Sequence, residues 1–536
     1  MYEKITVFIS NHRFPQWANI SLMFSPLILF VLLDERIWQD DLSQYGLLSL
    51  KLAQELKEHN VGNWISLLFT QDYQGKAPLM VWLLQFPALL FFLKFDLNTV
   101  YLFFQLVFVA IAVFLGYAIA KELNSKSAGY LFGYCFLGVN LVNGISKSNY
   151  VENLQFVIIL LTIYAFVVLP KKTLSKLTYN CIVISLITLA TLVKTNTVIF
   201  CWPFILMMIF ENRSSSKFSE FQRSGKDITI MISTLLLFLL TVIWYVNNFQ
   251  QVLSHSISAT GDLWSYNLTS MERFFKILFD IQHNFIALIL LIPMSIIAYL
   301  TTFKKNTSNF NKTQIALAIT LLSNITYFTL IDNSDVRLLY PSLGLLALSL
   351  SLLFGASSQS LKIFSTVTIV FSFWYVNINT LNINAKSISN HALILQTEST
   401  SKNDLYRILS KGCPIGSNGN QIMLAFRAPE LTKSAWDFHL FELQLKGEVS
   451  KNCEVVSVLT TEGMPIPTNE VDNMITMGKF SMFIDSTAEW KKLNPYYLKW
   501  SGNINNPDIV RSIGERYPNL HLVEYHKEWI VYEVRN

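Results

Sequence analysis

The chain has 536 residues, of which 52% are hydrophobic and only 14% are charged. A soluble protein of several domains needs more polar surface than this, so the composition indicates a polytopic membrane protein. The formal net charge of +5 is spread over short loops and forms no single basic patch, which argues against nucleic acid as a partner.

Long apolar runs recur along residues 1–386, which we expect to form one transmembrane domain. Most of these runs, with their flanks, are long enough to cross a hydrocarbon core of about 30 Å as helices. The first run follows Arg13 and lacks a small-residue cleavage site, so it predicts a retained span rather than a signal peptide. Clear examples are residues 21–33, 100–120, 151–169, 228–246, 287–300 and 363–376.

The apolar run of residues 78–95 decides the predicted topology. If it lies along the membrane and the N-terminus is cytoplasmic, the short Lys- and Arg-rich loops all fall on the cytoplasmic side, as the positive-inside rule requires. If it crosses the membrane, the same loops all fall outside. We therefore predict a juxtamembrane helix here and about eleven spans. The predicted external face then consists of residues 34–98, 146–152, 247–283 and 332–337.

The first external loop, residues 34–98, opens with a helical pattern. Apolar side chains recur every three or four positions from Trp38 to Leu56, with polar and charged residues opposite them. Such a helix would lie in the membrane interface or, alternatively, pack on the protein itself. Asp40 and Asp41 stand near its start, where the helix dipole favours carboxylates.

Composition changes abruptly toward the C-terminal end. Residues 387–536 alternate short apolar runs with helix-like segments at 404–410 and 507–516, which predicts a soluble α/β domain. An odd number of spans places this domain outside, where Cys413 and Cys453 could form a disulfide or remain two separate thiols. The expected strands are residues 392–395, 422–426, 455–459, 480–484, 520–523 and 529–532.

Two motifs in the first external loop are conspicuous against the low charge of the chain. Residues 38–46 read Trp-Gln-Asp-Asp-Leu-Ser-Gln-Tyr-Gly, so that an aspartate pair lies between a tryptophan and Tyr45. Residues 76–83 begin with Lys76, continue as Ala-Pro-Leu and include Trp82. Together they place carboxylates and a cation on one predicted face of the membrane.

Two later motifs fall on the same predicted face: Glu152 at the start of a span, and residues 337–341, which read Arg-Leu-Leu-Tyr-Pro. In this order the four motifs resemble GT-C fold glycosyltransferases that use polyprenyl-phosphate sugars, especially the family 39-like protein mannosyltransferases and lipid A aminoarabinose transferases. The resemblance extends over about residues 17–376. The chain departs from the family pattern where Leu42 replaces a glutamate, Ala77 replaces a proline and Glu152 replaces an aspartate.

The chemistry of such a transfer explains these residue types. An acceptor hydroxyl needs a base, and the departing lipid phosphate needs cations. Adjacent carboxylates can raise one pKa toward working pH, so Asp41 is the predicted base, with Glu152 as a second acidic, acceptor-positioning group. Lys76 and Arg337 are the predicted phosphate contacts. Lys194, between two apolar runs near the same face, is a further candidate for that role.

The identity of the acidic pair stays open from the sequence. Asp34 and Glu35 directly follow the first span and could serve instead of Asp40 and Asp41. The framing tryptophan and Tyr45 favour Asp41 as the base, with Asp40, Glu35, Tyr45 and Trp82 as supporting residues. Either pair could also be a simple helix cap at the interface.

Structural alternatives exist for the other candidates as well. Lys76 could be an interfacial anchor whose long stem crosses apolar surface. Arg337 could close a loop by pairing with Asp332 or Asp335. Glu152 could be a plain boundary residue at the entrance of a span.

No cofactor is expected. The eight histidines and five cysteines contain no cluster with zinc spacing. Asp40, Asp41 and Glu152 could together hold a divalent cation, but the resemblance implies metal-independent, inverting transfer. The chain has no phosphate-binding glycine loop and no dinucleotide fingerprint, which favours a lipid-linked donor over a nucleotide sugar.

The expected partners are a polyprenyl-phosphate sugar donor, an acceptor that is a lipid, a glycan or a protein, and membrane lipids. The expected location is the plasma membrane, with a cytoplasmic N-terminus and an external C-terminal domain. A transporter or lipid flippase is the competing class, but it would place charges near the bilayer midplane and in repeated halves. An inactive scaffold with this fold is a third possibility.

Overall fold

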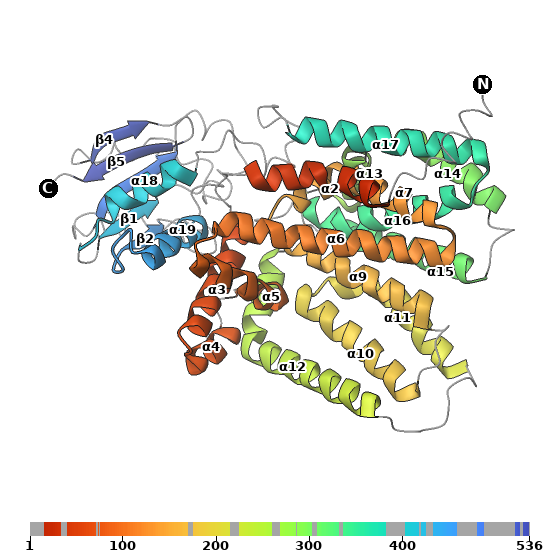
Figure 1. Ribbon diagram of the computed structural model, residues 1–536, viewed down its shortest axis with the longest axis horizontal. Coiled ribbons are helices and arrows are strands. Elements are labelled where there is room, and N and C mark those ends of the chain that lie inside the picture. Colours follow the sequence, from red (N-terminus) through yellow and green to blue (C-terminus); the bar gives the residue numbers. More distant parts are fainter. Residues whose placement is uncertain are drawn as a thin grey trace. The chain divides into compact units, whose positions relative to one another are not determined.

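The computed structural model separates the chain into two compact units (Figure 1). The first consists of Met1–Asp34 and Leu52–Ala392, and the second of Glu35–Lys51 and Leu393–Asn536. Helix α3 (Asp40–Lys57) therefore begins in the second unit and ends in the first. The structure describes residues 16–33, 40–70, 73, 75–169, 175–214, 225–259, 268–285, 287–302, 308–331, 336–381, 402–416, 420–424, 433–457, 480–486, 520–525 and 529–534.

The described part of the first unit is helical. Its elements follow the predicted apolar runs, because a helix satisfies every backbone hydrogen bond within its own segment. They are α2 (Gln16–Leu33), α4 (Val61–Leu68), α5 (Leu79–Ala88), η2 (Leu89–Leu93), α6 (Leu97–Leu123), α7 (Lys126–Leu137), α8 (Asn140–Ser146), α9 (Val151–Val168), α10 (Lys176–Val193), α11 (Thr197–Ser214), α12 (Gly225–Ala259), α13 (Ser270–Asn284), α14 (Leu288–Thr302), α15 (Ser308–Leu330), η4 (Val336–Leu339), α16 (Tyr340–Ala356) and α17 (Gln359–Leu381).

Many of these helices are long and apolar enough to span a membrane. Among the described residues seven helices qualify, or nine if the bent pairs α7 with α8 and α13 with α14 each count as one span. Ala18–Leu32, Leu79–Leu93 and Thr197–Phe210 are shorter apolar helices. The predicted class, a polytopic helical membrane protein with a smaller α/β part, is confirmed. The apolar run at residues 78–95 is helical as α5 and η2, and its orientation in the membrane stays a prediction.

Burial divides the spans into an inner and an outer group. The apolar windows of α9 and of the span that includes α16 are 83% and 78% buried, whereas those of α12 and α17 are only 17% and 28% buried. In Figure 1, α12 and α17 accordingly lie at opposite borders of the helical unit. Exposed apolar side chains on α12 are the expected surface of a helix that faces lipid. The interior of the first unit is thus built around α9 and α16.

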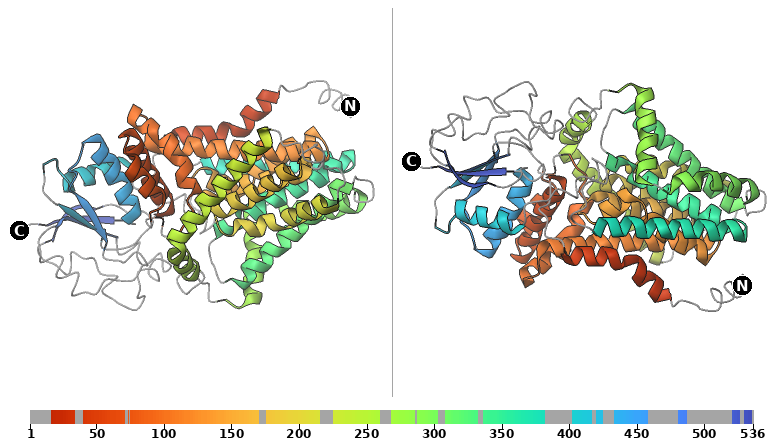
Figure 2. Two further views of the ribbon diagram at one scale, coloured as in Figure 1. Left: turned by 90° about the horizontal axis from the view of Figure 1, so that it is seen from below. Right: turned by 90° about the horizontal axis from the view of Figure 1, so that it is seen from above.

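The second unit contains a five-stranded sheet with the order β2-β1-β3-β5-β4. Strands β1 (Gln421–Leu424), β2 (Glu454–Ser457) and β3 (Phe480–Ser486) are parallel, while β5 (Trp529–Val534) is antiparallel to both β3 and β4 (Leu520–Tyr525). Helices α18 (Lys402–Gly412) and α19 (Lys433–Lys446) lie on one face of this sheet (Figure 2). This arrangement is the α/β unit that the alternation of short apolar runs predicted.

Alternate side chains of the strands pack into two cores. Ile422 and Leu424 of β1 pack with Trp436 of α19, on the helix-covered face. Met423, between them in the sequence, instead joins Phe483 on the other face. This is the period of two expected of a strand that is buried on both sides.

Most predicted elements of this unit are present. Five of the expected strands correspond to β1 to β5, and the helix expected at residues 404–410 is α18. The strand at 392–395 and the helix at 507–516 lie outside the described residues. Cys413 and Cys453, left open by the sequence, form a disulfide with a Cα–Cα distance of 5.7 Å.

Helix α19 was not predicted from the sequence. Its buried side chains include polar His439 and Glu442 beside apolar Trp436 and Leu443, so no clean amphipathic stripe marks it. The reason is tertiary: α19 is covered on more than one side, and polar groups inside it find partners on other elements.

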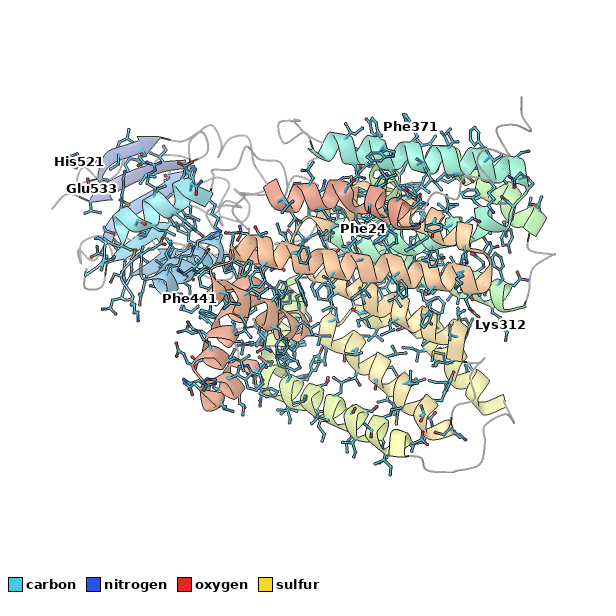
Figure 3. All side chains as sticks on the ribbon, in the orientation of Figure 1. Phe24, Lys312, Phe371, Phe441, His521 and Glu533 are labelled. Atoms are coloured by element: carbon cyan, nitrogen blue, oxygen red, sulfur yellow. A yellow bond between two sulfur atoms is a disulfide. The ribbon has the colours of Figure 1, made fainter. Side chains whose placement is uncertain are left out.

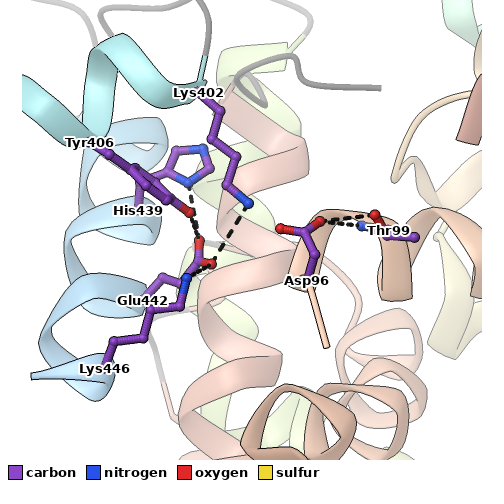
Figure 4. Close-up of polar contacts among 7 residues, drawn as sticks. All are labelled: Asp96, Thr99, Lys402, Tyr406, His439, Glu442 and Lys446. Atoms are coloured by element: carbon purple, nitrogen blue, oxygen red, sulfur yellow. Dashed lines mark hydrogen bonds and ion pairs between the residues drawn. The ribbon is translucent and has the colours of Figure 1, made fainter. Parts of the chain in front are cut away.

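Glu442 is the centre of a buried cluster of charges in the second unit (Figure 4). Its carboxylate accepts hydrogen bonds from Tyr406 and from Lys446, the latter at 2.9 Å. His439 lies at 3.4 Å and Lys402 at 3.7 Å. Burial by itself would raise the pKa of Glu442, but the bond from His439 and the two lysines outweigh it and lower that pKa.

We expect Glu442→Gln to destabilise the second unit by about 3 kcal/mol near pH 7, because the surrounding cations lose their buried counter-charge. Hydrogen exchange of the α19 amides, followed by mass spectrometry, measures this loss. Since the folded pKa of Glu442 is lowered, its contribution is complete above the ordinary glutamate pKa of 4.5 and is lost as the pH falls below that value.

The matched control is Asp404→Asn, which removes a carboxylate that pairs with Arg407 at the exposed surface. Exposed pairs contribute little, so this variant should exchange almost as the native protein does. If the amides of α19 exchange equally fast in the native protein and in Glu442→Gln at pH 7, Glu442 does not stabilise the second unit as proposed.

Candidate active site

The turn between α8 and α9 carries the most concentrated chemistry of the first unit. Residues 140–160 are buried throughout, although they include Lys147, Glu152 and several amides. Glu152 is the second residue of α9, in the first turn, where the positive end of the helix dipole stabilises a carboxylate. A carboxylate that is only 2% exposed nevertheless needs a specific partner.

Lys194 is that partner. It caps the C-terminal end of α10, and its Nζ lies 2.8 Å from Oε1 of Glu152. The lysine side chain keeps 28% of its surface exposed, whereas the carboxylate is closed off. Among the described residues, Oε2 of Glu152 has no hydrogen-bond partner. The pair therefore offers a fixed, partly exposed cation held by a buried carboxylate.

A network of buried amides holds this turn in place. Gln105 of α6 donates to Oδ1 of Asn149 at 2.8 Å and accepts from Nδ2 of Asn153 at 2.9 Å. The hydroxyl of Tyr340, the first residue of α16, donates to Oδ1 of Asn153 at 2.8 Å. Helices α6 and α16 are thereby tied to the residues that flank Glu152, and fully paired buried networks are rigid.

Two further cations belong to the same region. The guanidinium of Arg337 lies 4.7 Å above the ring of Tyr150, and Nζ of Lys147 lies 4.9 Å from the ring centre of Phe30. Cation–π contacts of this kind help to fix the position of a cation. Asp332 and Asp335, the alternative partners considered for Arg337, lie outside the described residues.

Lys147 was missed by the sequence analysis. It stands five positions before Glu152, in a segment with few other charges, and that isolation was the available signal. The amide network was missed too, because nothing local to an Asn or Gln in a helix reveals its partner on another helix. Lys194, the weaker candidate for the phosphate, proves to be the direct partner of Glu152.

Lys76 lies in a separate loop of the first unit, before α5. Gly75 has φ +77°, and a Cβ there would come within 2.4 Å of the backbone oxygen of Gln251 in α12, so only glycine fits. The backbone N–H of Lys76 donates to the carbonyl of Tyr73 at 3.0 Å. Trp82 donates from its indole nitrogen to the carbonyl of Leu68 at 3.3 Å. The loop that carries Lys76 is thus held by close backbone packing.

The predicted acidic residues of the first external loop are only partly described. Asp40 and Asp41 form the first turn of α3, as predicted, but their side chains lie outside the described part, as do Asp34 and Glu35 entirely. Tyr45 is buried, together with the other apolar positions of its stripe, Leu48 and Leu52. The stripe of α3 therefore packs on the protein itself, the second of the two alternatives.

Metal-ligating residues do not cluster in the part of the chain that the structure describes. No group of three or more His, Cys, Asp or Glu side chains there is arranged to hold a metal ion. The cation site considered for Asp40, Asp41 and Glu152 depends on side chains outside that part.

Comparison with known families places these residues in context. Residues 75–248 match the family described as dolichyl-phosphate-mannose-protein mannosyltransferase. The matched segment contains Lys76, Lys147, Glu152 and Lys194, but neither the aspartate pair of α3 nor Arg337. No curated protein sequence matches the chain.

Solved structures share the fold over nearly the whole length. ArnT from Cupriavidus metallidurans in the apo state superposes with a TM-score of 0.60 at 10% identity, over 96% of this chain and 97% of that chain. The same protein bound to undecaprenyl phosphate gives a TM-score of 0.55 at 11% identity, over 96% and 97%. A weaker likeness, with a TM-score of 0.49 at 10% identity over 92% of this chain and 72% of that chain, is found to the archaeal oligosaccharyltransferase AglB from Archaeoglobus fulgidus. The predicted resemblance to GT-C glycosyltransferases is therefore confirmed, since residues 75–248 match the dolichyl-phosphate-mannose-protein mannosyltransferase family and the chain has the fold of ArnT.

Proposed function

We propose that this protein is a membrane glycosyltransferase that moves a sugar from a polyprenyl-phosphate donor to an acceptor hydroxyl. The observation that carries the proposal is the buried ion pair of Glu152 and Lys194, which lies with the cations Lys147 and Arg337 at one turn of an apolar bundle. Support for a lipid donor comes from ArnT, which shares the fold and has been solved with undecaprenyl phosphate.

The proposed reaction is one displacement at the anomeric carbon. Asp41 accepts the proton of the acceptor hydroxyl as its oxygen attacks, and the bond from the sugar to the phosphate oxygen breaks on the opposite side. The polyprenyl phosphate leaves with the bonding electron pair, so the anomeric configuration is inverted. Asp34 remains the alternative base. Asp40, Glu35, Tyr45 and Trp82 are proposed as supporting residues.

Cations hold the phosphate in this scheme. Lys76 and Arg337 contact it, and Lys194 and Lys147 add positive charge where negative charge develops on the leaving oxygen. Because Lys194 is already fixed by Glu152 at 2.8 Å, its charge needs no rearrangement during the reaction. Glu152 is proposed to position the acceptor through Lys194, because its own carboxylate is buried. No metal takes part in these steps.

The membrane arrangement follows from the distribution of charged loops. The N-terminus is proposed to be cytoplasmic, with the site and the C-terminal domain from residue 387 on the external face of a plasma membrane. The acceptor is then a lipid, a glycan or a protein of the cell envelope.

We expect Asp41→Asn to abolish sugar transfer while donor binding is largely kept, because the amide has the same shape but cannot take a proton. Asp34→Asn, the matched control in the same loop, should transfer at close to the native rate. Transfer of radiolabelled sugar from a panel of polyprenyl-phosphate donors by the purified protein measures both.

If Asp34→Asn loses transfer and Asp41→Asn keeps full activity, the catalytic base is Asp34 rather than Asp41. If the native protein binds a donor specifically but transfers sugar from none of the donors, the proposed transferase activity is contradicted. That result would favour a transporter or an inactive scaffold.

We expect Lys194→Met to lower kcat/KM for the donor by about a hundredfold or more, because one fixed charge is lost at the leaving phosphate. The variant also leaves Glu152 buried without its cation, so its stability should fall. The double variant Glu152→Gln with Lys194→Met removes both charges and should regain stability but not activity. Steady-state kinetics and thermal unfolding separate the two effects.

Lys121→Met, at the exposed end of α6, is the control for loss of a lysine and should change neither quantity. Recovery of activity in the double variant would show that Lys194 serves only to neutralise Glu152.

A further inference from the structure

The second unit contains a groove that the proposed reaction does not use. Its cavity measures about 540 Å³, within the usual size of ligand sites. One wall is a face of α19, with Asp437, Leu440 and Phe441, and another is α3, with Leu47 and Lys51. All of these residues belong to the second unit.

The third side of the groove is the edge of the sheet. Five consecutive residues, 453–457, line it, although side chains on a strand alternate between its two faces. The cavity therefore runs along the outer edge of β2. This agrees with the position of β2 at the end of the strand order. Cys453 fixes the start of the edge through its disulfide with Cys413.

The lining combines both signs of charge with apolar surface. Nζ of Lys433 lies 2.6 Å from the carboxylate of Asp437, and Lys51 also acts on that carboxylate electrostatically. Glu454 adds a second carboxylate at the rim, and Phe441 adds a half-buried aromatic ring. Figure 3 shows Phe441 on α19.

This chemistry suits a hydroxyl-rich ligand. Each sugar hydroxyl can donate to a carboxylate and accept from an ammonium group, while the apolar face of a sugar ring can lie on an aromatic side chain. A ligand of one charge sign would meet a like charge in the groove. An extended polypeptide would pair with the sheet edge, but β2 has only four residues to offer.

We propose that this groove binds the oligosaccharide portion of the acceptor. The inference rests on the proposed function, because Leu47 and Lys51 belong to the same helix as the proposed base. Asp41 precedes Lys51 by ten positions on α3, which corresponds to about 15 Å along the helix axis at 1.5 Å per residue. An acceptor glycan seated in the groove is therefore held on the rigid element that also carries the reactive carboxylate.

The experiment uses the full-length protein in lipid nanodiscs on an array of short neutral and charged oligosaccharides, with a peptide array alongside. Phe441→Ala and Asp437→Asn should each weaken binding of the preferred glycan about tenfold or more, and Phe441→Tyr, which keeps the ring, should not. Leu522→Ala and Glu533→Gln, exposed on β4 and β5 at the far end of the strand order, are the matched controls and should bind normally.

Native binding that depends on the groove variants but not on the controls supports the proposal. Three results would overturn the proposal. The native protein binds no glycan, or both groove variants bind the glycan as well as the native protein does, or the groove variants reduce binding of peptides instead. Asp41→Asn should keep its glycan binding. Turnover by that variant would therefore refute the proposed base without affecting the groove, whereas turnover by native protein without glycan binding refutes the groove alone.

Discussion

A carboxylate buried in an apolar helical bundle is the constraint on which the first unit depends. Such a group is stable only if it is paired and hydrogen-bonded, and Glu152 meets this requirement through Lys194 at 2.8 Å. The pair joins the first turn of α9 to the last residue after α10, so it also sets how these two helices meet. Since α9 is the most buried of the candidate spans, its position influences every helix around it.

The polar residues of the site share a place in the helices as well as a chemistry. Glu152 and Lys194 lie at helix ends, Lys147 in a turn, and Arg337 in the short helix before α16. The charged groups of the site thus lie at helix ends and turns, while the spans contribute uncharged amides such as Gln105.

The second unit has a stable core of its own and still includes part of the first external loop. Glu442 and its partners order α18 against α19, and the disulfide of Cys413 and Cys453 ties the end of α18 to the sheet edge. The first part of α3 packs on this unit: a Cβ at Gly46 would lie only 2.9 Å from the ring of Phe438. The helix that carries the proposed base is thus anchored to the unit proposed to hold the acceptor.

Local sequence patterns were enough to identify the class of the protein and most of its elements. Hydropathy located the spans, short apolar runs located β1 to β5, and the pattern after Trp38 located α3, because these signals depend only on neighbouring residues. The sequence also singled out Glu152, Lys76, Arg337 and Lys194 as unusual charges in an apolar chain. What it did not predict was α19, whose polar residues are satisfied from other elements.

The contacts among these residues depend on how segments far apart in the sequence fold together. Glu152 and Lys194 are 42 positions apart, and Tyr340 reaches Asn153 across 187 positions, so no local pattern encodes either contact. Lys147 belongs to the site because the turn between α8 and α9 places it there, which its sequence position alone does not reveal. Likewise, the apolar stripe on α3 was compatible with contact to lipid or to protein. The burial of Leu48 and Leu52 shows that it packs on protein. An apolar helix face shows that the face is buried away from water. The sequence does not show what covers that face, because this depends on how distant helices pack.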